Sequence, residues 1–368
     1  MQRFSFHPMH PLLVPIVATC LAGPARSQRA PDDVAFNDSH FHLTNYIQRG
    51  VDLRAFLRIM GDRTRRVALF GIPLQQQWSH RVDGMNAPTY YLRSDAPLYY
   101  YSFTDAQIAM AYLALSPAER ARFDPMITGF NPADMYAVDH IRRALRTFPG
   151  VFTGIGEFTI HKEFVSAKIA GGSASLLDPA LDSILALAGE VGLIVLLHND
   201  VDTPFASVAA PPAYLDALRT VLARHPRTTI IWAHGGVGRV VRPVAHHIAM
   251  LDSIIRDPAF AHVYFDLSWD EVAKYIVASD TTIAATAAFV NRYPDRFLFG
   301  TDVVAPTQAS QYFAVVDLYG PFLARLTPAA RAQLLRDNYD RLFGAARQRV
   351  RSWEARDRAN DGTTSTIR

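Results

Sequence analysis

The chain alternates between short, almost wholly apolar runs and longer stretches whose apolar residues recur at helical spacing. Runs without alternating polar residues are typical of strands that are buried on both faces, as in a parallel sheet. The sequence therefore predicts eight buried strands, at Ala35–Phe41, Val67–Ile72, Met126–Phe130, Phe152–Phe158, Leu193–His198, Thr229–His234, Val263–Ser268 and Phe297–Thr301.

Helix signals stand between these strands. Asn131-Pro132 predicts a helix that continues to about Thr147, Asp178-Pro179 predicts one that Gly192 ends, and Pro212 predicts one that ends near His225. From the third strand on, the strands recur every 30–40 residues or so with a helix between them, which indicates parallel β/α units. Eight such units favour an α/β fold of one domain, a closed (β/α)₈ barrel of the TIM type.

The two ends of the chain differ from the barrel, which we expect to span residues 28–351. Arg3, the apolar stretch 11–22 and the small residues around 25–27 are typical of a secretory signal peptide, so we expect residues 1–27 to direct export to the periplasm or secretion. Residues 352–368 are polar, and we expect a flexible tail.

Composition excludes several classes of protein. The chain has 368 residues, of which 49% are hydrophobic and 19% charged, a globular composition. The only cysteine, Cys20, excludes a disulfide framework and an iron–sulfur cluster. The net charge of +3 is scattered, so we expect no nucleic-acid partner. After residue 27 no apolar stretch is long enough for an integral membrane span, and a serine-hydrolase elbow and a phosphate-binding loop are both absent.

Polar residues interrupt the predicted strands near their carboxyl ends, where a barrel has its active site. His40 and His42 are two residues apart on a strand, so they project to the same face. Four further candidates follow other strands, namely Glu157, His198, His234 and Asp302. Imidazole and carboxylate ligands without thiols suit Zn²⁺, Mn²⁺ or Fe²⁺. The alternative is that each is a polar group satisfied by its own neighbours.

With these residues, the motifs Gly156-Glu157, Trp232-Ala233-His234-Gly235-Gly236, Gly300-Thr301-Asp302 and Asp337-Asn338-Tyr339-Asp340-Arg341-Leu342-Phe343 complete a recognisable set. Over most of residues 35–345 the sequence resembles the amidohydrolase superfamily, and within it the amidohydrolase-related (amidohydrolase 2) group. The resemblance implies a distorted (β/α)₈ barrel with one or two divalent ions, zinc first among them.

The resemblance also implies roles for the candidate residues. His40, His42 and His198 would be metal ligands, and Asp302 would be both a ligand and a proton shuttle. His234 would be a ligand of a second metal or a catalytic acid/base. Glu157 would bridge two metals, as a fourth-strand residue does in binuclear members, or would instead orient a ligand histidine.

These ligands favour a metal-dependent hydrolase that cleaves a C–O or C–N bond in a small-molecule ester, lactone or amide. A bound divalent cation lowers the pKa of its water from ~15.7 towards ~7, and Asp302 would carry the proton. Two alternatives stay open: a metal-dependent decarboxylase of an unsaturated or aromatic carboxylic acid, and a non-catalytic exported binding protein.

The substrate is expected to contact three residues near the mouth of the barrel. Lys162 is interpreted as a loop cation there, while Arg239 and Trp269 are candidates for a carboxylate clamp and a pocket wall. Their alternatives are a surface arginine and ordinary helix packing. After the second strand, residues 75–104 form a long aromatic insertion, which we interpret as a lid or a subunit contact. A homo-oligomer stays open.

Overall fold

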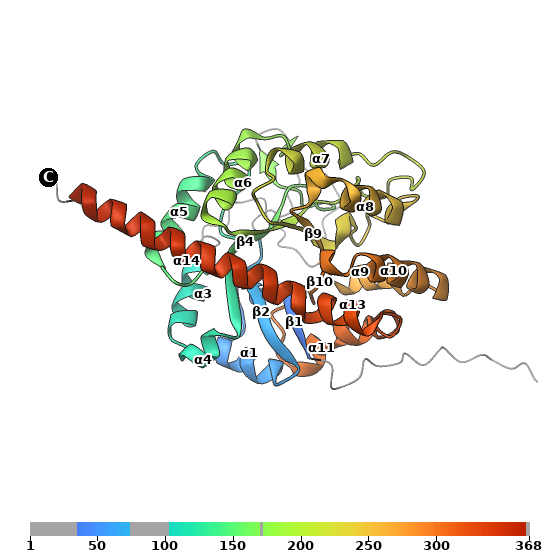
Figure 1. Ribbon diagram of the computed structural model, residues 1–368, viewed down its shortest axis with the longest axis horizontal. Helices are drawn as coiled ribbons and strands as arrows, with labels where there is room; N and C mark the ends of the chain where they lie inside the picture. Colours follow the sequence, from blue (N-terminus) through green and yellow to red (C-terminus); the bar gives the residue numbers. More distant parts are fainter. Residues whose placement is uncertain (1–34, 74–102, 170–171, 366–368) are drawn as a thin grey trace, which may run out of the picture.

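The computed structural model describes residues 35–73, 103–169 and 172–365 (Figure 1). The predicted signal peptide, residues 1–27, and almost all of the insertion expected at residues 75–104 therefore lie outside the described residues.

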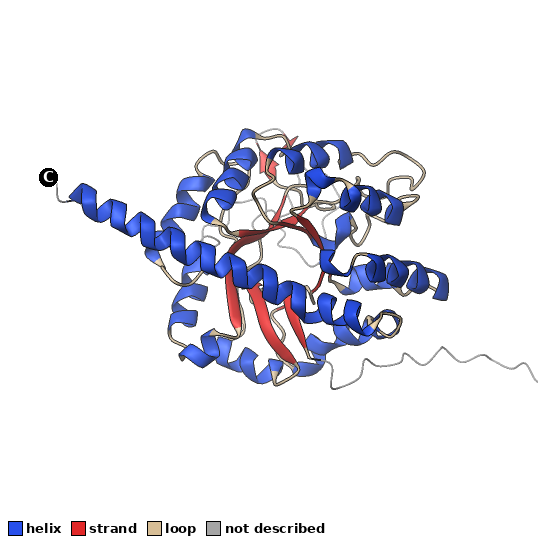
Figure 2. Ribbon diagram, in the orientation of Figure 1, coloured by secondary structure: helices blue, strands red, loops and turns tan. Residues whose placement is uncertain are grey.

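A parallel sheet forms the centre of the molecule, and helices surround it (Figure 2). The eight predicted strands are all present, with ends that differ by a few residues. With a ninth short segment they are β1 (Phe36–His42), β2 (Thr64–Phe70), β3 (Phe123–Ile127), β4 (Gly154–Thr159), β7 (Ile194–His198), β8 (Ile230–Trp232), β9 (Val263–Leu267), β10 (Phe297–Phe299) and β11 (Val303–Val304). Their order in the sheet is β10-β9-β8-β7-β4-β3-β2-β1-β11.

The first and last strands of that order, β10 and β11, are two segments of one extended stretch of chain. The backbone N–H of Gly300 donates to the Leu267 carbonyl (3.2 Å), on the side of β9. The N–H of Asp302 donates to the His40 carbonyl (2.7 Å), on the side of β1. Because this stretch bonds to both neighbours, the sheet closes on itself and the predicted (β/α)₈ barrel is confirmed.

Helices follow the strands and pack on the outside of the barrel. They are α1 (Leu53–Met60), α3 (Phe103–Leu113), α4 (Pro117–Arg120), α5 (Ala137–Thr147), α6 (Pro179–Val191), α7 (Leu215–Arg224), α8 (His247–Arg256), α9 (Asp270–Ile276), α10 (Asp280–Arg292), α11 (Ala309–Leu318), α12 (Gly320–Leu323), α13 (Pro328–Ala332) and α14 (Asn338–Ser365). Short turns of other helix types span Ala233–Gly236, Pro258–Phe260, Pro294–Arg296 and Gln333–Asp337, and a small antiparallel hairpin pairs β5 (Lys168–Ile169) with β6 (Gly172–Ser173).

The predicted helix boundaries are correct where capping is strong. Helix α6 begins at Pro179 behind an Asp178 cap and ends at Val191, before Gly192, which has a left-handed φ of 87°. The helix predicted from Asn131 begins only at Ala137. The side chains of Asn131 and Asp134 accept nearby backbone N–H groups and so hold turns instead of a helical start.

Helix α14 closes the end of the barrel at which the strands begin (Figure 1). Apolar residues of its first turns pack against the residues that fill the barrel interior: Tyr339, Leu342, Phe343 and Ala346 against Ala68, Phe70, Met126, Ile194, Leu196, Ile231, Ala233 and Leu298. The Tyr339 hydroxyl donates to Asp124 near the start of β3 (2.9 Å). The opposite end of the barrel, where the strands end, is not covered by this helix.

The same helix includes residues 352–365 of the segment predicted to be a flexible tail, and residues 366–368 lie outside the described residues. Trp353 is buried, and its indole N–H donates to Glu190 (3.4 Å). Asp357 accepts two hydrogen bonds from Arg146, of 2.8 and 2.9 Å. These contacts hold a polar sequence against the barrel. No helix within the described ranges has both the length and the apolar character that a membrane crossing requires.

Candidate metal centre

The structure brings all six predicted ligands together at the carboxyl ends of the strands. His40 and His42 lie on β1, Glu157 lies on β4, His198 ends β7, His234 follows β8, and Asp302 separates β10 from β11. All six are nearly inaccessible to solvent. Strands far apart in the sequence thus deliver four imidazoles and two carboxylates to one buried centre.

One half of this centre contains His40, His42 and Asp302. Nε2 of His42 lies 2.9 Å from Oδ1 of Asp302, and Nε2 of His40 lies 3.3 Å from the same oxygen. A carboxylate oxygen of Glu157 lies 3.3 Å from Nε2 of His42. Ligand atoms of His40, His42 and Asp302 lie within 4.8 Å of one another, close enough to hold a metal ion.

The other half contains His198 and His234. Nδ1 of His198 lies 2.5 Å from Oε1 of Glu157, and Nε2 of His234 lies 4.0 Å from that oxygen. Together Glu157, His198 and His234 form a second group that could hold a metal ion. Glu157 therefore presents one carboxylate oxygen to each half of the centre.

Three of the histidines present the same ring nitrogen, Nε2, to the centre. Nδ1 of His40 donates to Asp266 (2.7 Å), and Nδ1 of His42 donates to the Gly71 carbonyl (3.2 Å). Nδ1 of His234 lies 2.9 Å from the Ser268 hydroxyl, which in turn donates to Asp266 (3.1 Å). With Nδ1 engaged as a donor, each Nε2 is left as a potential ligand, the arrangement that outer partners impose on metal-binding histidines.

Three buried atoms in this centre have no hydrogen-bond partner among the described residues. They are Nε2 of His40, Nε2 of His234 and Oε2 of Glu157. Leaving buried polar atoms unpaired is costly, so each needs an explanation such as a bound ion. Their convergence with the two carboxylates fits a divalent cation held by imidazole and carboxylate groups.

Local backbone geometry places two of these side chains. Gly156 has a φ of 121°, and a Cβ atom there would collide with the Leu196 carbonyl, so only glycine fits before Glu157. His234 was predicted to end a strand, but β8 ends at Trp232 and His234 lies in a left-handed turn with a φ of 58°. The turn directs His234 inward because its backbone N–H donates to Asp266.

Charges inside the centre are strongly coupled. Burial alone would lower the pKa of His40, but Asp302 and Asp266 hold that pKa well above its usual value. Burial alone would raise the pKa of Asp302, but His40 beside it holds that pKa well below its usual range. Burial lowers the pKa of His234 to about 3, so its imidazole is neutral at physiological pH.

The three predicted substrate residues also lie at this centre. Lys162 was interpreted as a loop cation near the mouth, yet it is buried, with Nζ 3.5 Å from Glu157. Its Nζ lies 5.4 Å from the centre of the Trp269 ring, and that ring lies 5.1 Å from the ring of His234. The Arg239 guanidinium lies 5.6 Å from the Trp269 ring and 2.7 Å from Glu271. The side chains of Lys162 and Arg239 thus lie against the same indole ring, that of Trp269.

Sequence reasoning missed three carboxylates. Asp266 lies within the apolar run of β9 and bonds to both His40 and the His234 turn. Asp200 lies 3.1 Å from Nε2 of His198. Asp38 accepts from the backbone N–H and the hydroxyl of Thr301, joining the first and last strands. For Asp266, a single carboxylate inside an otherwise apolar strand was the available signal.

The fold and the site together define a (β/α)₈-barrel protein with a histidine–carboxylate centre suited to a divalent metal. A family model described as amidohydrolase matches residues 38–345, and the chain therefore belongs to the amidohydrolase family. This confirms the resemblance seen in the sequence. No curated protein matches the chain.

Solved structures of low sequence identity share the fold. One is a proposed 2-pyrone-4,6-dicarboxylic acid hydrolase from Pseudomonas putida, with 15% identity, a TM-score of 0.50, and coverage of 85% of this chain and 98% of that chain. A 2,6-dihydroxybenzoate decarboxylase from Rhizobium has 15% identity, a TM-score of 0.51, and coverage of 84% and 99%. An uncharacterized TIM-barrel protein from Bordetella bronchiseptica has 15% identity, a TM-score of 0.50, and coverage of 85% and 99%.

Proposed function

We propose that this chain is a metal-dependent hydrolase that cleaves a C–O or C–N bond in a small-molecule ester, lactone or amide. The observation that carries the proposal is the convergence of three unpartnered buried atoms, on His40, His234 and Glu157, beside the Asp302 carboxylate. Zinc suits these ligands best, with Mn²⁺ and Fe²⁺ as alternatives.

A divalent cation at this centre would supply Lewis acidity and make a water molecule acidic enough to attack at neutral pH. The chain's own groups would handle the protons. Asp302 is an anion in this site, so it would accept the proton of the attacking water and would return it to the leaving group. Neutral His234, with Nε2 lying 3.8 Å from Asp302, would bind the metal or hydrogen-bond the substrate oxygen.

We propose two metal ions, because Glu157 presents a carboxylate oxygen to each of the two ligand groups. Elemental analysis of the purified protein and of Glu157→Ala tests the count. About two ions per chain, falling to about one in the variant, would support a bridging glutamate. One ion in both proteins would make Glu157 a residue that only orients His198, and no binding of Zn²⁺ or Mn²⁺ would contradict the hydrolase.

Substrate recognition is assigned to Lys162, Arg239 and Trp269. The buried ammonium group of Lys162 and the guanidinium of Arg239 both lie against the Trp269 ring. A planar ring with two adjacent cations suits a substrate that carries an anionic group next to an apolar body. Lys162→Met should therefore raise the KM of an anionic lactone more than that of its neutral methyl ester.

A decarboxylase is the second candidate. The facing pair of Asp302 and neutral His234 could move a proton onto carbon after CO₂ leaves. The neighbour of similar fold that is a 2,6-dihydroxybenzoate decarboxylase supports keeping it. The two reactions are distinguished in H₂¹⁸O with lactone and aromatic-acid panels. A hydrolase incorporates ¹⁸O into its product, whereas a decarboxylase releases CO₂ without consuming water.

We also propose that the protein is exported through residues 1–27, whose composition is typical of a signal peptide. Expression in a Gram-negative host with and without these residues, followed by fractionation, tests this. Mature protein in the periplasm only when residues 1–27 are present would support export.

A further inference from the structure

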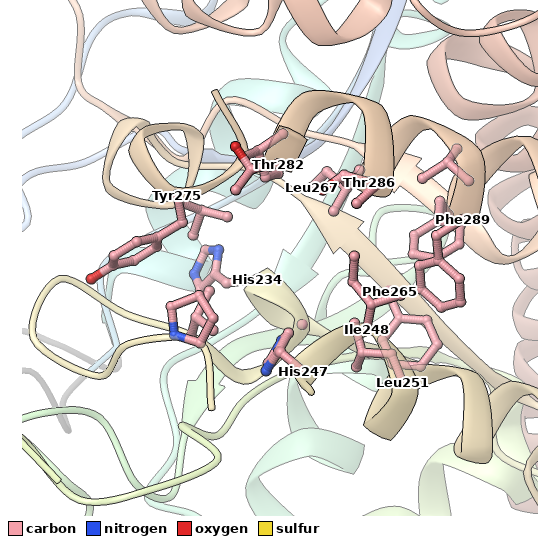
Figure 3. A pocket seen from close by; sticks show the side chains of 18 of the residues that line it. His234, His247, Ile248, Leu251, Phe265, Leu267, Tyr275, Thr282, Thr286 and Phe289 are labelled. Carbon is pink, nitrogen blue, oxygen red and sulfur yellow. The ribbon is translucent and has the colours of Figure 1, made fainter. Parts of the chain in front are cut away.

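A cavity of about 350 Å³ lies outside the barrel wall, between the strands and helices α8, α9 and α10. It reaches inward to Phe265 of β9 and is flanked by Leu251 of α8 and Phe289 of α10. Figure 3 shows these apolar side chains at one end of the pocket and His234 and Tyr275 at the other. Its volume lies within the range of small-molecule sites, about 300–1,000 Å³.

The chemistry of the wall is apolar and uncharged. None of the described residues that line the pocket is an aspartate, glutamate, lysine or arginine. The polar groups available are a few hydroxyls, from Tyr275, Thr282 and Thr286 among others, and histidine rings (Figure 3). An ion would lose its hydration here without gaining a partner charge, so the pocket selects against charged ligands.

His247 adds a neutral imidazole ring to this wall. Nδ1 of His247 is screened from solvent and has no hydrogen-bond partner among the described residues. The ring also bonds to the backbone of Gly235, and burial lowers the pKa of His247 to about 4. The neutral ring that donates to a carbonyl keeps a lone pair on its other nitrogen. Nδ1 has almost no surface open to the cavity, so His247 contributes a neutral ring to the wall and no charge.

The pocket has a route to solvent. A second hollow of about 600 Å³ lies between α8 and α10, and it shares His246, Ile248, Ala285 and Phe289 with the first. Ala285 is exposed on α10, where a larger side chain would narrow the entrance without disturbing the core. The inner cavity is deep enough to reach the strands, which favours a small molecule over a flat protein surface.

We propose that this pocket binds a neutral, mostly apolar small molecule. At about 30 Å³ for each water-sized unit, the volume of about 350 Å³ holds roughly a dozen non-hydrogen atoms. This is the size of two linked six-membered rings with a hydroxyl. The pocket lies on the outer side of the barrel wall, and the turn at His234 and Gly235 lies between it and the metal centre.

The experiment titrates the purified full chain with 4-phenylphenol, a neutral two-ring compound with one donor, and measures binding by calorimetry. The comparison compound is 4-phenylbenzylamine, which has the same rings and is a cation at neutral pH. Ala285→Trp places an indole at the entrance. Ala284→Trp is the matched control, because Ala284 is exposed on the same helix but does not line the pocket.

We expect 4-phenylphenol to bind with one-to-one stoichiometry, at least about tenfold more tightly than the amine because the wall offers no counter-charge. Ala285→Trp should weaken binding at least about tenfold, while Ala284→Trp leaves it unchanged. The proposal is overturned if the wild type shows no saturable binding, if Ala285→Trp binds equally well, or if the amine binds as tightly. Sedimentation tests whether a second copy of the chain fills the pocket instead. If the wild type is a dimer and Ala285→Trp is a monomer, the pocket is a subunit contact and the proposal of a small-molecule site is overturned.

Discussion

Asp266 should control how tightly the centre holds a metal, although it is not itself one of the six predicted ligands. One oxygen accepts from Nδ1 of His40 (2.7 Å), and the other accepts from the backbone N–H of His234. Asp266→Asn keeps the shape of the side chain but presents an amide that donates where the carboxylate accepted. If the amide NH₂ faces His40, that ring accepts on Nδ1 and carries its proton on Nε2, the atom that faces the centre. If the NH₂ faces the His234 turn instead, the backbone N–H of His234 loses its acceptor.

The magnitude follows from this one contact. A hydrogen bond to a charged group contributes about 1.5–3 kcal/mol, and about 1.4 kcal/mol changes an equilibrium constant tenfold. In either orientation one candidate ligand histidine loses its partner, so metal binding should weaken by about 10- to 100-fold, the usual effect of changing a partner of a ligand histidine. The measurement is a competition titration of Zn²⁺ between the metal-free protein and a chromogenic chelator.

Asp124→Asn is the matched control. Asp124 is also a buried strand carboxylate with several partners, including Arg66 (2.7 Å) and Arg347 (2.6 Å), but it lies at the opposite end of the barrel. This variant should unfold at lower temperature and bind Zn²⁺ as the wild type does. The reasoning fails if Asp266→Asn keeps wild-type affinity, or if Asp124→Asn loses as much affinity as Asp266→Asn.

Three further predictions concern stability. Thr301→Val removes a 2.7 Å hydrogen bond to Asp38 and should lower the free energy of unfolding by about 1–3 kcal/mol. Calorimetry should show this as a lower Tm, and an unchanged Tm would mean that this bond does not stabilise the contact between the first and last strands. Burial raises the pKa of Asp105 from 3.8 to about 7, so the folded state keeps a proton that the unfolded state releases. The free energy of unfolding in urea should therefore fall as the pH rises from about 4 to about 7. Asp105→Asn should remove the contribution of Asp105 to this pH dependence, and the same pH dependence in both proteins would contradict the prediction. Trp353→Ala should let trypsin cleave faster at Arg356, whereas unchanged cleavage would show that Trp353 does not anchor α14.

The fold was predictable because its signals are local. Each strand of a parallel barrel is buried on both faces, so its sequence is an apolar run wherever the chain places it. The convergence of the candidate ligands was predictable for a related reason, since a polar residue such as His198 or Asp302 at the carboxyl end of such a run must lie at one mouth. Neither inference needed knowledge of which strands are neighbours.

What could not be predicted depends on contacts between distant parts of the chain. Asp266 points into the barrel from an apolar strand, and only closure of the sheet brings His40 and His234 against it. Lys162 follows β4 by a few residues, and nothing in its neighbours indicated that the chain would bury it beside Glu157. The polar end of α14 lies against another helix, where Asp357 accepts hydrogen bonds from Arg146.

The closing seam of the barrel has a consequence for how an ion would be acquired. His40 and His42 come from the first strand, while Asp302 comes from the last, and Asp38 bonds to Thr301 directly beneath them. A chain still on the ribosome has the first half of this ligand group long before the second. An ion that needs all three groups can bind only after the ends of the barrel have met. The compartment in which the chain completes folding, and the cations available there, would therefore decide which metal the protein carries.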